Sequence, residues 1–129
     1  MRALLDTNAF LWWLADRNRL TATARHFIRE PENGLYLSVA SAWEISIKAK
    51  TGKLKLPETP EIYIPSRIAH YDFQVLDITM PHVLKVWSLP LIHRDPFDRI
   101  IIAQSQVETL PIVSSDRVFA QYGLDVIWK

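Results

Sequence analysis

The chain has 129 residues, of which 49% are hydrophobic and 22% charged, so it fits one globular domain and excludes disordered and collagen-like classes. It contains no cysteine, which excludes disulfide frameworks, cysteine nucleophiles and thiolate zinc sites, and its formal net charge of +1 does not require an anionic partner. The sequence also lacks a signal-peptide pattern and any apolar run of about 18 residues, so we expect a cytoplasmic protein without a membrane segment.

Short apolar strands and helical segments alternate along the chain. In chain order we predict a strand at 2–5, helices at 7–15 and 21–30, a strand at 35–38, helices at 39–51 and 60–71, a strand at 73–78, helices at 80–88 and 96–109, a strand at 111–114, a helix at 116–122 and a strand at 124–128. Thr21 is the expected N-cap of the second helix, and Gly52 and Gly123 are expected to end the third and the last. The alternation predicts an α/β fold with a largely parallel sheet covered on both faces, in a single domain over residues 1–129.

Two strands end in acidic segments. The first runs into Asp6-Thr7-Asn8 and the fourth into Ser114-Ser115-Asp116. Ligands of open α/β sheets bind beyond the carboxyl ends of the strands, so the topology alone brings Asp6 and Asp116 to one edge. Each acid also has a structural interpretation, because Asp6 could cap the following helix and Asp116 could lie favourably in the first turn of its own helix.

A third acidic segment, Arg94-Asp95-Pro96-Phe97-Asp98-Arg99, opens the helix at 96–109. Asp95 is a good N-cap and Pro96 is well placed at the first helical position. A cap does not need a second acid in the same turn, so Asp98 is the better candidate for a metal ligand.

Glu44 lies within the predicted helix 39–51, on the face that also carries Ala40, Trp43 and Ile47. A carboxylate on an apolar face is costly unless it is paired. Lys48, four residues later, could pair with it, and so could a metal ion.

Four carboxylates in one crevice would repel one another and raise their pKa values unless a divalent cation neutralised them. Oxygen ligands favour Mg²⁺ or Mn²⁺, and such a site suits the hydrolysis of phosphodiesters. The four histidines show no paired spacing, so we expect them on the surface and do not expect zinc.

Together these segments, with Ser41-Ala42-Trp43-Glu44-Ile45, resemble the ordered acidic motifs of PIN domains, and closely those of VapC toxins. The resemblance spans essentially the whole chain. It implies a three-layer sandwich with a five-stranded parallel sheet, Mg²⁺ or Mn²⁺ dependence, and endoribonuclease activity on cellular RNA. It further implies a homodimer that acts as the toxin of a type II toxin–antitoxin pair and is neutralised by a VapB-type antitoxin.

The resemblance also implies roles for individual residues. The catalytic and metal-binding acids it implies are Asp6, Glu44, Asp98 and the more variable Asp116. The positions expected to support them are Thr7, Asn8, Ser114 and the additional acid Asp95.

Cations near these motifs are candidates for binding the RNA backbone. They are Lys53 and Lys55, in a lysine run that begins at Lys48, and Arg94 and Arg99 beside the acids. For the lysines, a solvated helix end is an equally good interpretation, because the helix dipole favours cations there.

Two other classes of function remain open. A phosphatase would use an aspartate after the first strand, but Asp6-Thr7-Asn8 lacks the second acid of an Asp-x-Asp motif. A phosphoacceptor would use an aspartate after the third strand, where Asp77 is better interpreted as a turn residue. A non-catalytic module could use tryptophans to hold RNA or protein, although core packing is the expected role of most of the five. The adjacent Trp12 and Trp13 cannot both face one core, so one of them is expected at a surface.

Overall fold

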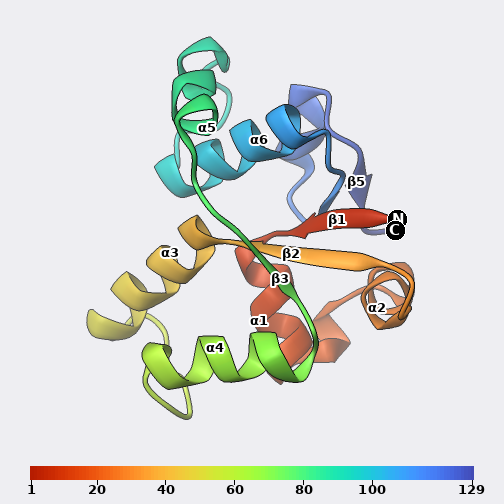
Figure 1. Cartoon of the computed structure of the whole chain (residues 1–129), viewed down its shortest axis with the longest axis vertical. Coiled ribbons are helices and arrows are strands. Elements are labelled where there is room, and N and C mark those ends of the chain that lie inside the picture. The colour runs from red at the N-terminus through yellow and green to blue at the C-terminus, as the bar shows by residue number, and fades with distance from the viewer.

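A computed structural model describes all of residues 1–129 and shows an α/β fold around one five-stranded sheet (Figure 1). The strands are β1 (Arg2–Leu5), β2 (Gly34–Ser38), β3 (Gln74–Leu76), β4 (Ile112–Val113) and β5 (Val126–Ile127). All neighbouring strands pair in parallel, in the order β3-β2-β1-β4-β5. The chain therefore builds outward from β1 to one side and later to the other, so the strand order reverses beside β1, where open α/β sheets bind ligands.

The helices cover both faces of this sheet. They are α1 (Thr7–Ala15), α2 (Ala22–Arg29), α3 (Val39–Lys50), α4 (Pro60–His70), α5 (Met80–Lys85) and α6 (Pro96–Glu108). Figure 1 places α1 and α4 on one side of the sheet and α5 and α6 on the other. Three short 3₁₀ helices join them: η1 (Arg17–Arg19), η2 (Val86–Ser88) and η3 (Arg117–Tyr122). The α/β sandwich with a parallel sheet is thus confirmed.

The central strand contributes to both halves of the core. Ala3 and Leu5 lie in a buried cluster with Phe10 and Trp13 of α1, whereas Leu4 lies in a second cluster with Ile101 and Ile102 of α6. Successive side chains of a strand point to opposite faces, so a strand buried on both faces is apolar throughout. This packing fixes the carboxyl end of β1, and with it Asp6.

Several predicted boundaries differ from the structure. The edge strand β3 covers only 74–76 of the predicted 73–78, and β5 only 126–127 of the predicted 124–128. The last predicted helix is the 3₁₀ helix η3, and the end of the helix predicted at 80–88 is the 3₁₀ helix η2. Short helical segments often take the tighter 3₁₀ form. The predicted helix ends are confirmed at Thr21, which accepts from Ala24 N, and at Gly52 and Gly123, which adopt positive φ.

The tryptophans divide between core and surface. Trp13 is buried, and Trp12 and Trp128 are half-buried against the core and against each other, with ring centroids 6.0 Å apart. Trp43 and Trp87 are exposed. Core packing is therefore confirmed for three of the five. The expectation that Trp12 and Trp13 cannot face one core was wrong, because the half-buried Trp12 packs against the same buried cluster that contains Trp13. None of the helices is long and apolar enough to cross a bilayer.

Candidate active site

Asp6 follows the last residue of β1 and is 6% exposed. The neighbouring strand β4 brings Ser114 beside it, and the Ser114 hydroxyl donates to Asp6 Oδ2 at 2.6 Å. Burial raises the pKa of Asp6, hydrogen bonds from Ser114 and the Asn8 backbone lower it, and the charges of Asp116 and Glu44 raise it again, for a net increase. The site thus holds a carboxylate whose negative charge is poorly compensated.

The residues after Asp6 have different surroundings. The buried Thr7 donates its hydroxyl to Ser41 Oγ of α3 at 2.8 Å, which ties α1 to α3. Asn8 is exposed. Of the two hydroxyl residues predicted to support the acids, Ser114 hydrogen-bonds a carboxylate directly, whereas Thr7 hydrogen-bonds Ser41.

Glu44 is 6% exposed on α3, and its two oxygens differ. Oε2 accepts from Lys48 Nζ at 2.7 Å, so the predicted pairing with Lys48 is confirmed. Oε1 is buried and has no hydrogen-bond partner. Such an atom costs free energy unless a ligand contacts it.

The prediction that Glu44 lies on an apolar face of α3 with Ala40, Trp43 and Ile47 was only partly right. Ala40 is buried, but Trp43 and Ile47 are 59% and 42% exposed. The side chains buried beside Glu44 on this helix are instead those of Ser41 and Ile45, because the sheet and α1 cover that side. Trp43 packs edge-to-face on Phe97 at the start of α6, with centroids 4.9 Å apart.

The two acids at the start of α6 have separate roles. Asp95 is the N-cap, and its Oδ1 accepts from the backbone N–H groups of Phe97 at 2.8 Å and Asp98 at 3.2 Å. The pKa of Asp98 is raised to about 7, mainly by burial and then by the charges of Asp6 and Asp95, against a lowering by His93. The charge of Glu44 raises the pKa of Asp98 further, so the charges of Asp6, Glu44 and Asp98 act on one another.

Asp116 completes the acidic group from β4 and η3. Its Oδ1 accepts from Val118 N at 2.9 Å, which caps η3, and its own backbone N–H donates to Ser114 Oγ at 2.9 Å. Ser114 therefore contacts both Asp6 and Asp116. The charges of Asp116 and Glu44 raise the pKa of Asp6, and those of Asp6 and Glu44 raise the pKa of Asp98, so all four predicted acids lie within electrostatic range of one another at the carboxyl edge of the sheet.

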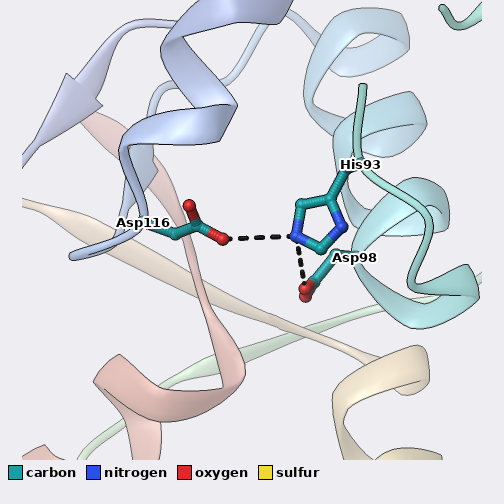
Figure 2. A group of neighbouring side chains, drawn as sticks. All are labelled: His93, Asp98 and Asp116. Atoms are coloured by element: carbon teal, nitrogen blue, oxygen red, sulfur yellow. Dashed lines mark hydrogen bonds and ion pairs between the residues drawn. The ribbon is translucent and has the colours of Figure 1, made fainter. Parts of the chain in front are cut away.

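His93 also belongs to this site, and the expectation of surface histidines was wrong for it. Its Nε2 lies 2.9 Å from Asp98 Oδ2 and 3.2 Å from Asp116 Oδ2 (Figure 2). One potential ligand atom from each of these three residues lies within 4.8 Å of the others. Its position two residues before Asp95 was the available signal.

His82 corrects the same expectation. It is fully buried between α5 and α6, where its Nδ1 accepts from Thr79 N and its Nε2 lies 2.7 Å from Glu108 Oε2. These contacts join the two helices away from the acids.

The candidate RNA-binding cations lie in different settings. Arg99 donates from its guanidinium to four backbone carbonyls, those of Val86, Leu89, Pro90 and His93. The guanidinium therefore holds the loop before α6, and phosphate would have to compete with those bonds. Arg94 is exposed, and with Arg99 it lines a cavity of about 570 Å³ beside this loop.

Lys53 and Lys55 are exposed beyond the end of α3. Lys55 lines a cavity of about 940 Å³ between α3 and α4 that also contains Glu58 and Glu61, so the charge there is mixed. Within this lysine run, Lys48 forms an ion pair with an acid of the site, Glu44.

The donor set fits a divalent cation. Several carboxylates converge, the pKa values of Asp6 and Asp98 are raised, and Glu44 Oε1 is buried without a partner. A hard cation such as Mg²⁺ or Mn²⁺ prefers oxygen ligands and would compensate this charge.

Known proteins share this fold and sequence pattern. The chain is 37% identical over 68 residues to Ribonuclease VapC16 of Mycobacterium tuberculosis, a match over 50% of this chain and 48% of that protein, so the chain spans about half the length of this relative. It resembles the structure of VapBC2 from Rickettsia felis bound to a promoter DNA fragment, with TM-score 0.74, 13% identity and 100% coverage of both chains. It also resembles VapBC-1 from nontypeable Haemophilus influenzae, with TM-score 0.68, 18% identity and coverage of 98% and 96%.

At these identities the two solved structures show a common fold. The PIN domain family matches residues 3–124, which include every acid of the site. Both the order of the acidic motifs and the parallel sheet that gathers them agree with this match, and the chain belongs to the PIN domain family.

Proposed function

We propose that this protein is a divalent-metal-dependent endoribonuclease and the toxin of a type II toxin–antitoxin pair. The buried, unpartnered Glu44 Oε1 among converging carboxylates is the observation that carries the metal-dependent activity. The similarity to Ribonuclease VapC16 supports RNA as the substrate, and the neighbouring VapBC structures support the toxin role.

In this proposal Asp6, Glu44 and Asp98 hold the cation, and Asp116 adds a fourth carboxylate. Mg²⁺ or Mn²⁺ bound there would activate a water for attack and neutralise charge on the phosphate. Ser114 orients Asp6 and Asp116 through its two hydrogen bonds. Lys48 holds one oxygen of Glu44, which leaves the other for the cation.

The RNA backbone needs cations around this acidic centre. Arg94 is the best placed, because it is exposed and directly precedes the cap of α6. Lys53 and Lys55 would contact RNA farther from the reacting phosphate. For Arg99 we propose a supporting role through the loop carbonyls rather than direct phosphate binding.

An antitoxin of the VapB type and a second copy of the chain are the proposed protein partners. Exposed apolar side chains on α5, η2 and the following loop support the presence of a protein partner, since soluble monomers rarely expose large apolar patches. The most exposed are Met80, Leu84, Trp87 and Leu91. A nuclease that acts on cellular RNA would be located in the cytoplasm, as the sequence predicts for this protein.

A phosphoacceptor is less well supported. Asp77 is exposed and follows β3 at the edge of the sheet, away from the four acids, and its backbone carbonyl accepts from Gln104. A purely binding module would not explain why four carboxylates gather in a partly buried site at a cost in free energy.

The test is to incubate the purified protein, free of antitoxin, with total RNA and Mg²⁺ or Mn²⁺, and to map the new RNA ends. We expect discrete cleavage that stops in EDTA and is absent with the Asp6→Asn variant. Equal cleavage in EDTA, or equal cleavage by a folded Asp6→Asn protein, would refute the proposed site.

A further inference from the structure

The loop residue His93 is held firmly at the acidic site. Its backbone N–H donates to the Tyr122 hydroxyl at 2.7 Å, and that hydroxyl donates to Pro90 O at 2.7 Å. Its carbonyl accepts from Arg99 Nη1 at 3.0 Å. Its ring stacks on the buried Phe119, with centroids 6.0 Å apart and planes inclined by 22°. The imidazole is therefore fixed in one orientation before any ligand binds.

The hydrogen bond at Nδ1 determines where the proton of the neutral ring lies. The backbone N–H of Asp95 donates to His93 Nδ1 at 3.3 Å, so Nδ1 is the acceptor and Nε2 carries the hydrogen. Nε2 is hydrogen-bonded to Asp116 Oδ2 at 3.2 Å and also lies 2.9 Å from Asp98 Oδ2, an ion-pair distance (Figure 2).

This arrangement differs from that of a metal-binding histidine. A ligating nitrogen has no proton, and the other ring N–H usually donates to a carboxylate or carbonyl. If Nε2 bound the cation, the hydrogen would have to lie on Nδ1, where it would face the N–H of Asp95. The distances among His93, Asp98 and Asp116 would suit a shared cation, but the surroundings of Nδ1 do not.

We infer that His93 is a positioning residue whose Nε2, hydrogen-bonded to Asp116 and in close contact with Asp98, sets the geometry of both acids for the cation, without being a ligand itself. The two acids come from different elements, α6 and the turn after β4, and would otherwise repel each other. The inference rests on the proposed metal site, but the position of the hydrogen on His93 can be tested without metal.

The first experiment is NMR of the ¹⁵N-labelled, metal-free protein, using two-bond couplings in the imidazole ring. We expect the Nε2–H form of His93, with its hydrogen protected from exchange. An Nδ1–H form would overturn the inference whether or not metal binds.

The second experiment measures Mn²⁺ and Mg²⁺ affinity by calorimetry for wild type, His93→Ala, His93→Gln and His26→Ala. Loss of an outer hydrogen-bond partner typically weakens metal binding by about 10-fold to 100-fold. We expect His93→Ala to weaken both metals by the same factor within this range. His93→Gln should recover most of the loss, because its amide N–H can donate from a similar position, and the exposed His26 provides a matched control.

Pulsed EPR of the Mn²⁺-loaded wild type supplies the third readout. We expect no directly coordinated nitrogen. A coordinated nitrogen, a loss confined to Mn²⁺, or unchanged affinity in His93→Ala would each overturn the inference. If the wild type binds neither metal, the proposed function fails, whereas the NMR result still decides whether His93 donates to the acids.

Discussion

At the residue scale, the charge of Asp98 is expected to have opposite effects on stability and on the proposed activity. Its carboxylate is partly buried near Asp6 and Asp95, which favours the protonated form. The same negative charge is what a divalent cation needs. The site therefore stores an unfavourable interaction in the metal-free protein that metal binding would relieve.

We predict that Asp98→Asn raises the melting temperature of the metal-free protein, while RNA cleavage falls by orders of magnitude. Asparagine keeps the shape and removes the charge, so repulsion decreases and the cation loses a ligand. Thermal melts in EDTA and cleavage assays with Mn²⁺ measure the two effects. The exposed Asp125→Asn is the control and should change neither. Cleavage by Asp98→Asn at the wild-type rate would show that Asp98 is not a ligand of the catalytic cation.

The metal-free protein should also lose stability as the pH rises. The folded pKa of Asp98, about 7, is above its ordinary value of 3.8, so the folded state retains a proton that the unfolded chain releases. This contribution is fully present below the unfolded pKa and is lost as the pH rises through about 7. The pKa of Asp6 is shifted in the same direction.

Melting temperatures in EDTA should thus fall between about pH 4 and about pH 7, and fall less in Asp98→Asn. The difference between variant and wild type across this range isolates Asp98 from other titrating groups. Parallel pH profiles for the two proteins would contradict the raised pKa.

At the element scale, the loop between η2 and α6 depends on one arginine. Four of its carbonyls accept from Arg99, and the loop carries His93 into the acidic site. The neighbouring Arg94 is exposed. Two arginines in the same short segment thus have opposite surroundings.

We predict that Arg99→Lys destabilises the fold by about 1–2 kcal/mol, because an ammonium cannot contact all four carbonyls. Arg94→Ala should leave stability unchanged and weaken RNA binding with a shallower salt dependence. Urea unfolding and filter binding in the uncleaving Asp6→Asn background measure these effects. If Arg99→Lys weakens RNA binding without loss of stability, Arg99 contacts phosphate directly, as the sequence first indicated.

The elements also show how far local sequence patterns extend. The apolar run at 2–5 and the helix at 7–15 were predicted with their exact bounds, because strong periodicity and packing agree there. The helix predicted at 116–122 and the edge strands were less accurate, since short segments depend on neighbours that the sequence does not display.

Some residues of the candidate site could likewise be predicted from the sequence and others could not. The placement of Asp6, Asp98 and Asp116 could be predicted because acids at strand ends and helix starts follow from topology, and that of Glu44 because it lies in a family motif, while their roles stay predictions. His93 had only its closeness to Asp95 in the sequence as a signal, because its orientation depends on Phe119, Tyr122 and Arg99 from later parts of the chain. The exposure of Trp43 and Ile47 was likewise decided by which side of α3 meets the sheet.

At the scale of the whole molecule, the proposed metal site would link metal binding to folding. A cation that binds only the folded chain raises the free energy of unfolding by about 2.7 kcal/mol at a concentration of about 100 times Kd, or about 10 °C in melting temperature. We predict this shift in Mn²⁺ or Mg²⁺ relative to EDTA, measured by calorimetry. The shift should nearly vanish in Asp6→Asn. The same melting temperature with and without metal in the wild type would contradict a divalent site.

The hydrogen bond between Ser114 and Asp6 joins residues 108 positions apart in the chain. During synthesis, residues emerge from the ribosome in order, and Asp6 and Glu44 would be outside long before β4 could pair with β1. A nascent chain would therefore carry an incomplete acidic centre for most of its translation. If the proposed nuclease activity requires the complete acidic centre, it would be absent from a nascent chain until β4 has been made and has paired with β1.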